Sequence, residues 1–262
     1  MKQWHELLQR VMLEGEERKD RTGVGTRSLF GMGASFYNTT AFPAVTTKRL
    51  GFDQVKAELA AFVHGAQTLA EFHRWGCTLW NKNAAAQKRT YLGPMYGAQW
   101  REWAHIDQLA ELVENVKKDP WSRRHLVSAW NVEELESMLL PPCHHSFQVS
   151  VRDQGRFLDM IVNMRSVDLF LGLPFDVASY ALLQRLIAKD TNLMSGNLTF
   201  FMGDAHIYSN HFDAVKTVLA REPLPAPVLH LWSEASALTF EPQHARLDMY
   251  QAHEAVKAEL NA

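Results

Sequence analysis

The chain is poor in cysteine and has no histidine-rich tract. Only two cysteines, Cys77 and Cys143, occur among 262 residues. Two cysteines exclude a disulfide scaffold and a cysteine-rich zinc module, and they favour a reducing compartment such as the cytoplasm. The twelve histidines are scattered from His5 to His253, so no local cluster predicts a metal site. We therefore expect a protein without a metal cofactor.

Long apolar runs and an excess of one charge are also missing. The apolar window 175–188 is interrupted by Asp176, Gln184 and Arg185, so it is too short and too polar to span a membrane. Residues 1–20 lack the continuous apolar stretch of a signal peptide. The formal net charge of −2 gives no reason to expect a nucleic-acid polymer as partner.

What remains is the composition of an ordinary globular chain, 47% hydrophobic and 21% charged. With no internal repeat and no low-complexity linker, we expect one α+β domain over residues 1–262. Asp53 is a candidate helix cap, Gly15 and Gly65 are candidate helix ends, and the polar stretch 16–27 is expected to be a loop. Periodicity predicts helices over 4–12, 53–64, 106–116, 175–189 and 209–221, and strands over 28–36, 125–130, 145–151, 157–164 and 198–202. Helices interspersed with strands favour a mixed sheet covered by helices.

Cys143 is a candidate nucleophile. It lies in Leu-Leu-Pro-Pro-Cys-His-His, where two prolines keep the preceding backbone extended. The alternative is that Cys143 is simply a small buried hydrophobic residue. A Cys–His hydrolase pair with His144 is disfavoured, because adjacent residues of a strand point to opposite faces.

Arginines suggest a phosphate site. Arg21 lies in a glycine-containing loop, Arg123 and Arg124 follow Ser122, and Arg165 with Ser166 ends a predicted strand. Guanidinium groups and a hydroxyl suit a phosphate monoester. Each arginine alone could be a solvated surface charge, although Arg165 directly follows an apolar run and is harder to explain in that way.

Two carboxylates and a His-Tyr pair complete the candidates. Glu58 is flanked by alanines and leucine, and Asp176 lies between Phe175 and Val177. Such surroundings raise the pKa of a carboxyl group and suit proton transfer near neutral pH, although Asp176 could instead be a helix N-cap. His206 and Tyr208 share one face of a strand, where both could bond a ligand hydroxyl or be satisfied inside the core.

Several blocks resemble the thymidylate synthase family. PPCHHSFQVSV, MRSVDLFLGLPFDVASYALL and GDAHIYSNH are similar to its core, as are DRTGVGT, FPAVTTKR, LGPMYGAQW and SRRHLVSAWN. The resemblance extends over the whole chain. It implies a thymidylate-synthase-like α+β fold whose mixed sheet is covered by helices on one side and forms a homodimer interface on the other. It also implies a pyrimidine deoxynucleotide monophosphate as substrate and 5,10-methylenetetrahydrofolate as co-substrate.

The resemblance also assigns roles to single residues. Cys143 would add to C6 of the base, Glu58 would organise water and proton transfers, and Tyr96 would assist near C5. The arginines beside Cys143 are expected to lower the pKa of its thiol. The resemblance assigns phosphate binding to Arg21, Arg165 and Ser166, with Arg123 and Arg124 reaching in from the partner subunit. It assigns sugar binding to His206 and Tyr208. It assigns folate contact to Trp80, Asn261 and Asp168, and Asp168 would also contact the nucleotide.

Asp176 departs from the family pattern, because thymidylate synthases have asparagine there. An amide can accept from N3–H of uracil and donate to O4, whereas a carboxylic acid can donate to N3 of cytosine and accept from its amino group. Asp176 resembles the residue of phage deoxycytidylate hydroxymethylases, as does the sequence Asn-Met-Arg-Ser at 163–166. We therefore expect dCMP rather than dUMP as substrate, in the host cytoplasm if a phage encodes the protein.

Further departures concern the product. The tail 257–262 lacks the ending that closes over folate in the synthases, and Gly51 and Asn83 stand where the family has a histidine and a tryptophan. These changes would admit water to the exocyclic methylene at C5, giving 5-hydroxymethyl-dCMP. The retained Trp80 favours the alternative, hydride transfer to give 5-methyl-dCMP. Two further alternatives are a thymidylate synthase acting on dUMP and a binding protein without turnover.

Overall fold

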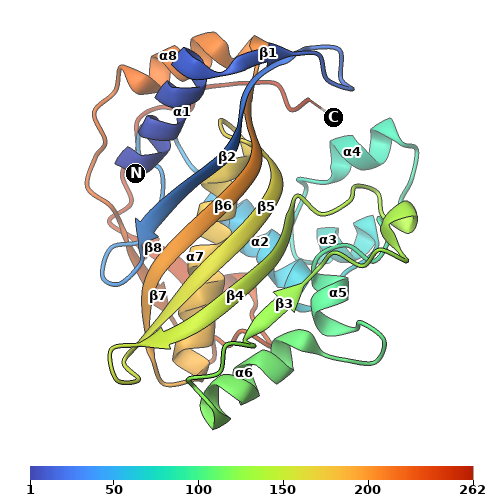
Figure 1. Cartoon of the computed structure of the whole chain (residues 1–262), viewed down its shortest axis with the longest axis vertical. Helices are drawn as coiled ribbons and strands as arrows, with labels where there is room; N and C mark the ends of the chain where they lie inside the picture. Colours follow the sequence, from blue (N-terminus) through green and yellow to red (C-terminus); the bar gives the residue numbers. More distant parts are fainter. Residues whose placement is uncertain (262) are drawn as a thin grey trace.

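A mixed six-stranded sheet with the order β1-β2-β6-β5-β4-β3 organises the chain (Figure 1). The computed structural model describes residues 1–261. A second, two-stranded sheet pairs β7 with β8. The elements are α1 (Lys2–Glu14), β1 (Glu16–Arg18), β2 (Thr26–Tyr37), α2 (Phe52–Val63), α3 (Leu69–Arg74), α4 (Asn81–Ala86), α5 (Gly97–Arg101), α6 (Gln108–Lys118), β3 (Leu126–Ser128), β4 (His144–Arg152), β5 (Phe157–Asp168), α7 (Gly172–Asp190), β6 (Met194–Tyr208), α8 (Phe212–Leu219), β7 (Val228–Leu231) and β8 (Ala245–Asp248).

The sheet is mixed because one connection crosses over. Strands β5 and β6 run parallel and are joined by α7, whereas the other neighbouring pairs are antiparallel. A parallel pair needs such a long connection. The predicted mixed sheet with helices is therefore confirmed, and the predicted hairpin joins β4 to β5 through Asp153 and Gln154, both with positive φ.

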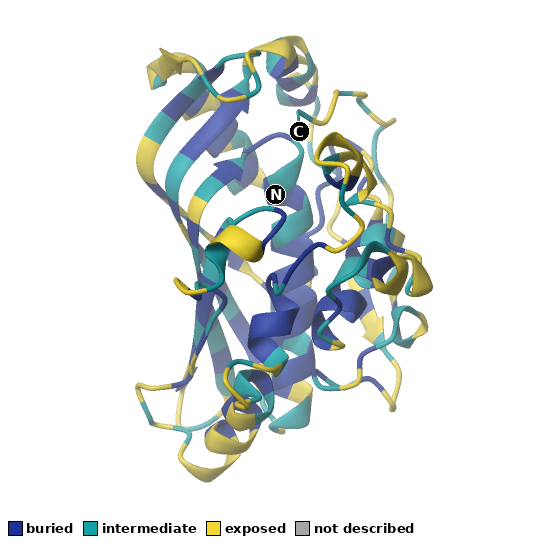
Figure 2. Ribbon diagram, turned by 90° about the vertical axis from the view of Figure 1, so that its right-hand side faces the viewer, coloured by how far each residue is buried: buried dark blue, intermediate teal, exposed yellow. Residues whose placement is uncertain are grey.

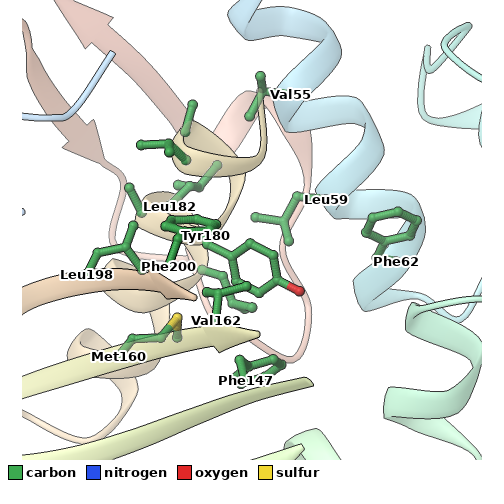
Figure 3. Packing of buried hydrophobic residues seen from close by; sticks show 14 of the residues in the cluster. Val55, Leu59, Phe62, Phe147, Met160, Val162, Tyr180, Leu182, Leu198 and Phe200 are labelled. Carbon is green, nitrogen blue, oxygen red and sulfur yellow. The ribbon is translucent and has the colours of Figure 1, made fainter. Parts of the chain in front are cut away.

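One face of the sheet is covered by helices (Figure 2). Along β5, Leu158, Met160, Val162 and Met164 are buried and alternate with less buried residues, as expected for a strand with one covered face. Helix α7 packs against β5 and β6 and is buried almost all round. Figure 3 shows side chains of α2, α7 and the strands packed together behind the sheet. Burying one such Leu or Phe side chain contributes about 2 kcal/mol.

The opposite face of the sheet carries large apolar side chains that no helix covers. Tyr37 on β2 and Phe201 on β6 are 75% and 52% exposed, and Phe30 on β2 is 79% exposed. Apolar side chains gathered on one exposed face are typical of a protein interaction surface. No helix among residues 1–261 is long and apolar enough to cross a membrane.

Some local predictions were wrong. The expected loop 16–27 begins with strand β1, because its three residues pair with β2. Helix α2 has Gly51 as its N-cap, and Asp53 lies inside the first turn. The segment 209–221 opens with a 3₁₀ turn before α8. The short helices α3, α4 and α5 and the strands β7 and β8 were not predicted, because segments of four to six residues show too little periodicity.

Candidate active site

Cys143 lies directly before β4, next to the side chains of Tyr96 and Arg165. Its backbone N–H donates to the Tyr96 hydroxyl at 3.0 Å. The Arg165 guanidinium bonds the carbonyl oxygens of Pro142 and Pro141 at 2.9 and 2.7 Å, and its Nη2 lies 3.8 Å from Cys143 Sγ. The two prolines therefore anchor a positive charge beside the sulfur.

Arg165 and Arg21 lower the pKa of Cys143, as expected, but the expected preference for the thiolate was wrong. Burial raises the pKa of this thiol above its usual value, and Arg165 offsets that effect only in part. The carboxyl group of Asp176 acts in the same direction as burial. Desolvation of a thiolate outweighs the two guanidinium charges that act on Cys143, so the thiol form predominates at neutral pH.

Tyr96 adopts an unusual backbone conformation beside Cys143. Its φ is +41° and its ψ is −101°, a region that residues other than glycine rarely occupy. The next residue, Gly97, approaches α2 so closely that a Cβ atom would collide with the Phe62 carbonyl. Strained backbone of this kind collects at functional sites, and here it aims the Tyr96 hydroxyl at the Cys143 backbone.

Glu58 is a partly buried carboxyl group on α2. The Trp80 indole N–H donates to its Oε1 at 2.9 Å. Burial raises the pKa of Glu58 to about 7, and the Trp80 hydrogen bond opposes this only weakly. The predicted elevation is confirmed, and the group can both accept and donate a proton near neutral pH.

Asp176 is a second partly buried carboxyl group, on α7. Burial, with Glu58 and Asp168 adding to it, raises the pKa of Asp176 well above its usual value, which favours the protonated, neutral form of the carboxyl group. The elevation was expected from its apolar neighbours. The N-cap alternative was wrong, because α7 begins at Gly172 and places Asp176 in the helix interior.

The carboxyl ends of β5 and β6 bring further candidates together. Their parallel pairing sets Ser166 beside Asp204 and Asp168 beside His206. Oδ1 of Asp168 accepts from the N–H groups of Phe170 and Leu171 at 2.8 and 3.2 Å, which fixes its side chain at the start of α7.

His206 and Tyr208 share one face of β6, as predicted, with ring centroids 5.1 Å apart. Asp204 Oδ1 accepts from His206 Nδ1 at 3.0 Å. The proton of the neutral imidazole is then on Nδ1, and Nε2 can accept from a hydroxyl group. Burial raises the pKa of Tyr208 to about 12, so its hydroxyl keeps its proton.

Three further arginines and the tail residue Asn261 were also predicted to belong to the site. Arg21 is exposed in the loop between β1 and β2, and its charge acts on both Cys143 and Tyr208. Arg123 and Arg124 are exposed at the β3 edge, where Arg124 lines a separate cavity of about 470 Å³ beside α6. The Asn261 amide is paired reciprocally with that of Asn210, at 3.1 and 3.2 Å.

Residue-by-residue reasoning missed three polar side chains here. His144 and Tyr180 share a hydrogen bond of 2.8 Å between Nδ1 and the hydroxyl. Lys48 donates to the Phe170 carbonyl at 2.6 Å, and burial lowers its pKa to about 8. Tyr180 follows Asp176 by four residues, so helical spacing could have placed both on one face of α7. Among residues 1–261 no group of three potential metal ligands occurs.

The whole chain matches a known family. The family model described as "Thymidylate synthase" matches residues 2–262. A protein of Escherichia phage T5 described as "Probable thymidylate synthase" is 42% identical over 287 aligned positions, which cover the full length of both chains. With Cys143, Glu58 and the arginines placed as above, these matches lead to one conclusion: the chain belongs to the thymidylate synthase family.

Proposed function

We propose that this enzyme, a methylenetetrahydrofolate-dependent C5 one-carbon transferase by its family, acts on dCMP and releases 5-hydroxymethyl-dCMP. The observation that carries the choice of substrate is the partly buried carboxyl group of Asp176, whose raised pKa favours its protonated form. A protonated carboxyl group can donate to N3 of cytosine and accept from the exocyclic amino group. Uracil would meet two mismatched groups, which is costly in a buried site.

The nucleotide is held by groups that surround Cys143. Arg21, Arg165 and Ser166 bind the phosphate, and His206 with Tyr208 binds the sugar hydroxyl. Cys143 then forms a bond from its sulfur to C6, and the electron pair of the C5–C6 double bond becomes available at C5. Because the Cys143 thiol is protonated at neutral pH, its proton must pass to solvent water before the sulfur attacks, and the adjacent Arg165 charge favours the resulting thiolate.

The folate would lie against Trp80 and Asp168. The Trp80 side chain is half-buried and packs edge-on against Phe72 and at a tilt against Tyr96, so it can present a ring face to a flat heterocycle. Asp168 uses its Oδ1 for the hydrogen bonds with the backbone of Phe170 and Leu171, which leaves its Oδ2 for a ligand. The tail residue Asn261 would contact the same ligand. Bound folate supplies the one-carbon unit.

The open sheet face is proposed as a homodimer interface. Its exposed Phe30, Tyr37 and Phe201 are apolar, as the centre of such an interface usually is. Arg123 and Arg124 are exposed at the edge of the same sheet and contribute nothing to the group around Cys143 in their own subunit. We therefore assign them to the phosphate site of the partner subunit.

Hydroxymethylation is proposed because the chain can place water near C5. The partly buried Glu58 has a pKa raised to about 7, and its carboxylate can take a proton from a water molecule that adds to the exocyclic methylene. Gly51 and Asn83 leave more room on the folate side than larger side chains would. The tail residue Glu259 bonds to Lys82 on α4 and to His211 in the 3₁₀ turn before α8, and these contacts hold the tail in place.

Two other outcomes remain candidates on specific observations. Methyl transfer to dCMP is favoured by Trp80, which is retained beside Glu58. Methyl transfer to dUMP is favoured by the description of the phage T5 relative, "Probable thymidylate synthase". These three reactions differ in nucleotide mass and in folate oxidation.

A product assay separates the three reactions. Purified enzyme is supplied with methylenetetrahydrofolate and either dCMP or dUMP, the nucleotide is analysed by mass spectrometry, and dihydrofolate is followed by absorbance. We expect hydroxymethyl-dCMP without dihydrofolate. Methyl-dCMP with dihydrofolate would contradict the role proposed for water, and product from dUMP alone would contradict the role proposed for Asp176.

Glu58→Gln tests the proton acceptor. Turnover of the unchanged enzyme should rise with pH through about 7, because the pKa of Glu58 is raised to that value and its ionised form is the active one. The amide cannot take up a proton, so kcat should fall by about 100-fold or more and the rise near pH 7 should disappear. Glu6→Gln, at an exposed position on α1, is the control and should keep both. An unaltered pH profile in Glu58→Gln would assign the proton transfer to another group.

A further inference from the structure

A buried polar chain links α7 and β4 behind Asp176. The Tyr180 hydroxyl lies 2.8 Å from His144 Nδ1, and His144 Nε2 lies 3.8 Å from Asp176 Oδ1. Tyr180 and Asp176 are four residues apart on α7, so both face β4 from one side of the helix. The imidazole is therefore held between the phenol and the carboxyl group.

The imidazole has little freedom to turn. The Tyr96 ring stacks on it at 4.1 Å, and the Tyr180 ring meets it edge-on at 5.3 Å. Tyr180 is itself packed among Trp100, Phe147 and Phe200. Figure 3 shows the Tyr180 ring inside the apolar cluster, with its hydroxyl oxygen at the edge of the cluster. The positions of the three polar groups are thus fixed by packing.

The protons of this chain can be placed by counting donors and acceptors. Burial lowers the pKa of His144 to about 3 and raises the pKa of Tyr180 well above its usual value, so the imidazole is neutral and the phenol is protonated. Among residues 1–261, Nδ1 of His144 is the only hydrogen-bond partner of the Tyr180 hydroxyl. The phenol therefore donates to Nδ1, and the imidazole proton is on Nε2.

We propose that Tyr180 and His144 are positioning residues that decide which oxygen of Asp176 carries the acidic proton, and so make the site selective for cytosine. An N–H at Nε2 favours a carbonyl oxygen at the facing Oδ1, which assigns the proton to Oδ2. The separation of 3.8 Å is longer than a hydrogen bond, so the N–H at Nε2 attracts Oδ1 electrostatically at this distance. A small rotation of the Asp176 carboxyl group would bring the two atoms into a hydrogen bond. This inference rests on the proposed dCMP specificity.

Without the phenol donor, the assignment would reverse. In Tyr180→Phe, Nδ1 loses its donor and can itself carry the imidazole proton. Nε2 is then a bare acceptor that attracts the Asp176 proton to Oδ1. The oxygen left for the base would accept rather than donate, which suits N3–H of uracil instead of N3 of cytosine.

The first test reads the proton directly. Nitrogen-15 NMR of the histidine side chains, with His144 assigned by its loss in His144→Gln, should show a protonated Nε2 and an unprotonated Nδ1 in the unchanged enzyme. Tyr180→Phe should convert His144 partly or wholly to the Nδ1–H tautomer. An Nδ1–H tautomer in the unchanged enzyme, or a spectrum that Tyr180→Phe does not alter, would overturn the inference.

The second test is a double-mutant cycle on specificity. The ratio of kcat/KM for dCMP to that for dUMP should fall by about 10-fold in Tyr180→Phe, because one buried hydrogen bond is reversed. In the Asp176→Asn background the same change should alter the ratio by less than about 2-fold. Phe147→Leu, which loosens the packing of the Tyr180 ring without touching His144, should lower both kcat/KM values together.

The outcomes separate the two proposals. A dCMP preference that survives Tyr180→Phe contradicts the inference and leaves the proposed function intact. An equal loss of selectivity in both backgrounds would also contradict it, since it would show an effect that does not pass through Asp176. A preference for dUMP in the unchanged enzyme contradicts the proposed function, and the tautomer spectrum then still tests the arrangement of protons.

Discussion

Asp176→Asn is expected to reverse the choice of nucleotide. The amide can turn so that its oxygen accepts from N3–H of uracil and its nitrogen donates to O4, and neither contact suits cytosine. Two buried hydrogen bonds are exchanged, each worth about 1–3 kcal/mol when left unmade, so the ratio of kcat/KM for dCMP to that for dUMP should fall by about 100-fold or more. Steady-state kinetics with both nucleotides measures this ratio.

The pH dependence gives an independent check. Asp176 must be protonated to donate to cytosine, and its pKa is raised well above the usual value. Turnover of dCMP should therefore persist through neutral pH and decline on the alkaline side, as the pH rises through the pKa of Asp176. Asp176→Asn should remove that decline. Asp213→Asn, at an exposed position on α8, serves as the matched control, and a nucleotide preference unchanged in Asp176→Asn would refute the assignment.

Cys143→Ser is expected to cause the greatest loss of turnover. A hydroxyl group is far harder to ionise than a thiol, and the neighbouring His144 is a very weak base, since its pKa is about 3. We expect kcat to fall by on the order of 10³-fold or more. Mass spectrometry of denatured reaction mixtures should find a nucleotide covalently attached to the unchanged enzyme and none attached to the variant.

Cys77 provides the control for this experiment. It is fully buried next to α3, and burial raises its pKa to about 12, so it is inert. Cys77→Ala should keep the covalent adduct and most of the activity. Full activity in Cys143→Ser would rule out covalent addition at C6 through this residue.

The long helices and strands and the residues of the site could be predicted from the sequence, whereas the pKa of Cys143 could not. Helices α1, α2, α6 and α7 and strands β2, β4, β5 and β6 were predictable because each is long enough to show periodic burial. The raised pKa values of Glu58 and Asp176 followed from their apolar neighbours. The pKa of Cys143 was misjudged because charge is visible in a sequence whereas depth of burial is not.

Contacts between distant segments were beyond sequence reasoning. The bond from Trp80 to Glu58 joins α4 to α2, and that from Tyr180 to His144 joins α7 to β4. Neither pair shares a local pattern, because each contact depends on how helices pack over the sheet. The strained backbone of Tyr96 is similarly a product of the close approach of Gly97 to α2.

The crossover from β5 through α7 to β6 has a consequence for how substrate choice can evolve. Arg165 and Ser166, assigned to the phosphate, and His206 and Tyr208, assigned to the sugar, lie at the carboxyl ends of two paired strands. Asp176, assigned to the base, lies on the helix between these strands. A single nucleotide change in a codon can exchange Asp and Asn at position 176 without shifting either strand. A change in base specificity can therefore precede any change in the rest of the pocket, and evolutionary intermediates would still bind the phosphate and sugar of the nucleotide.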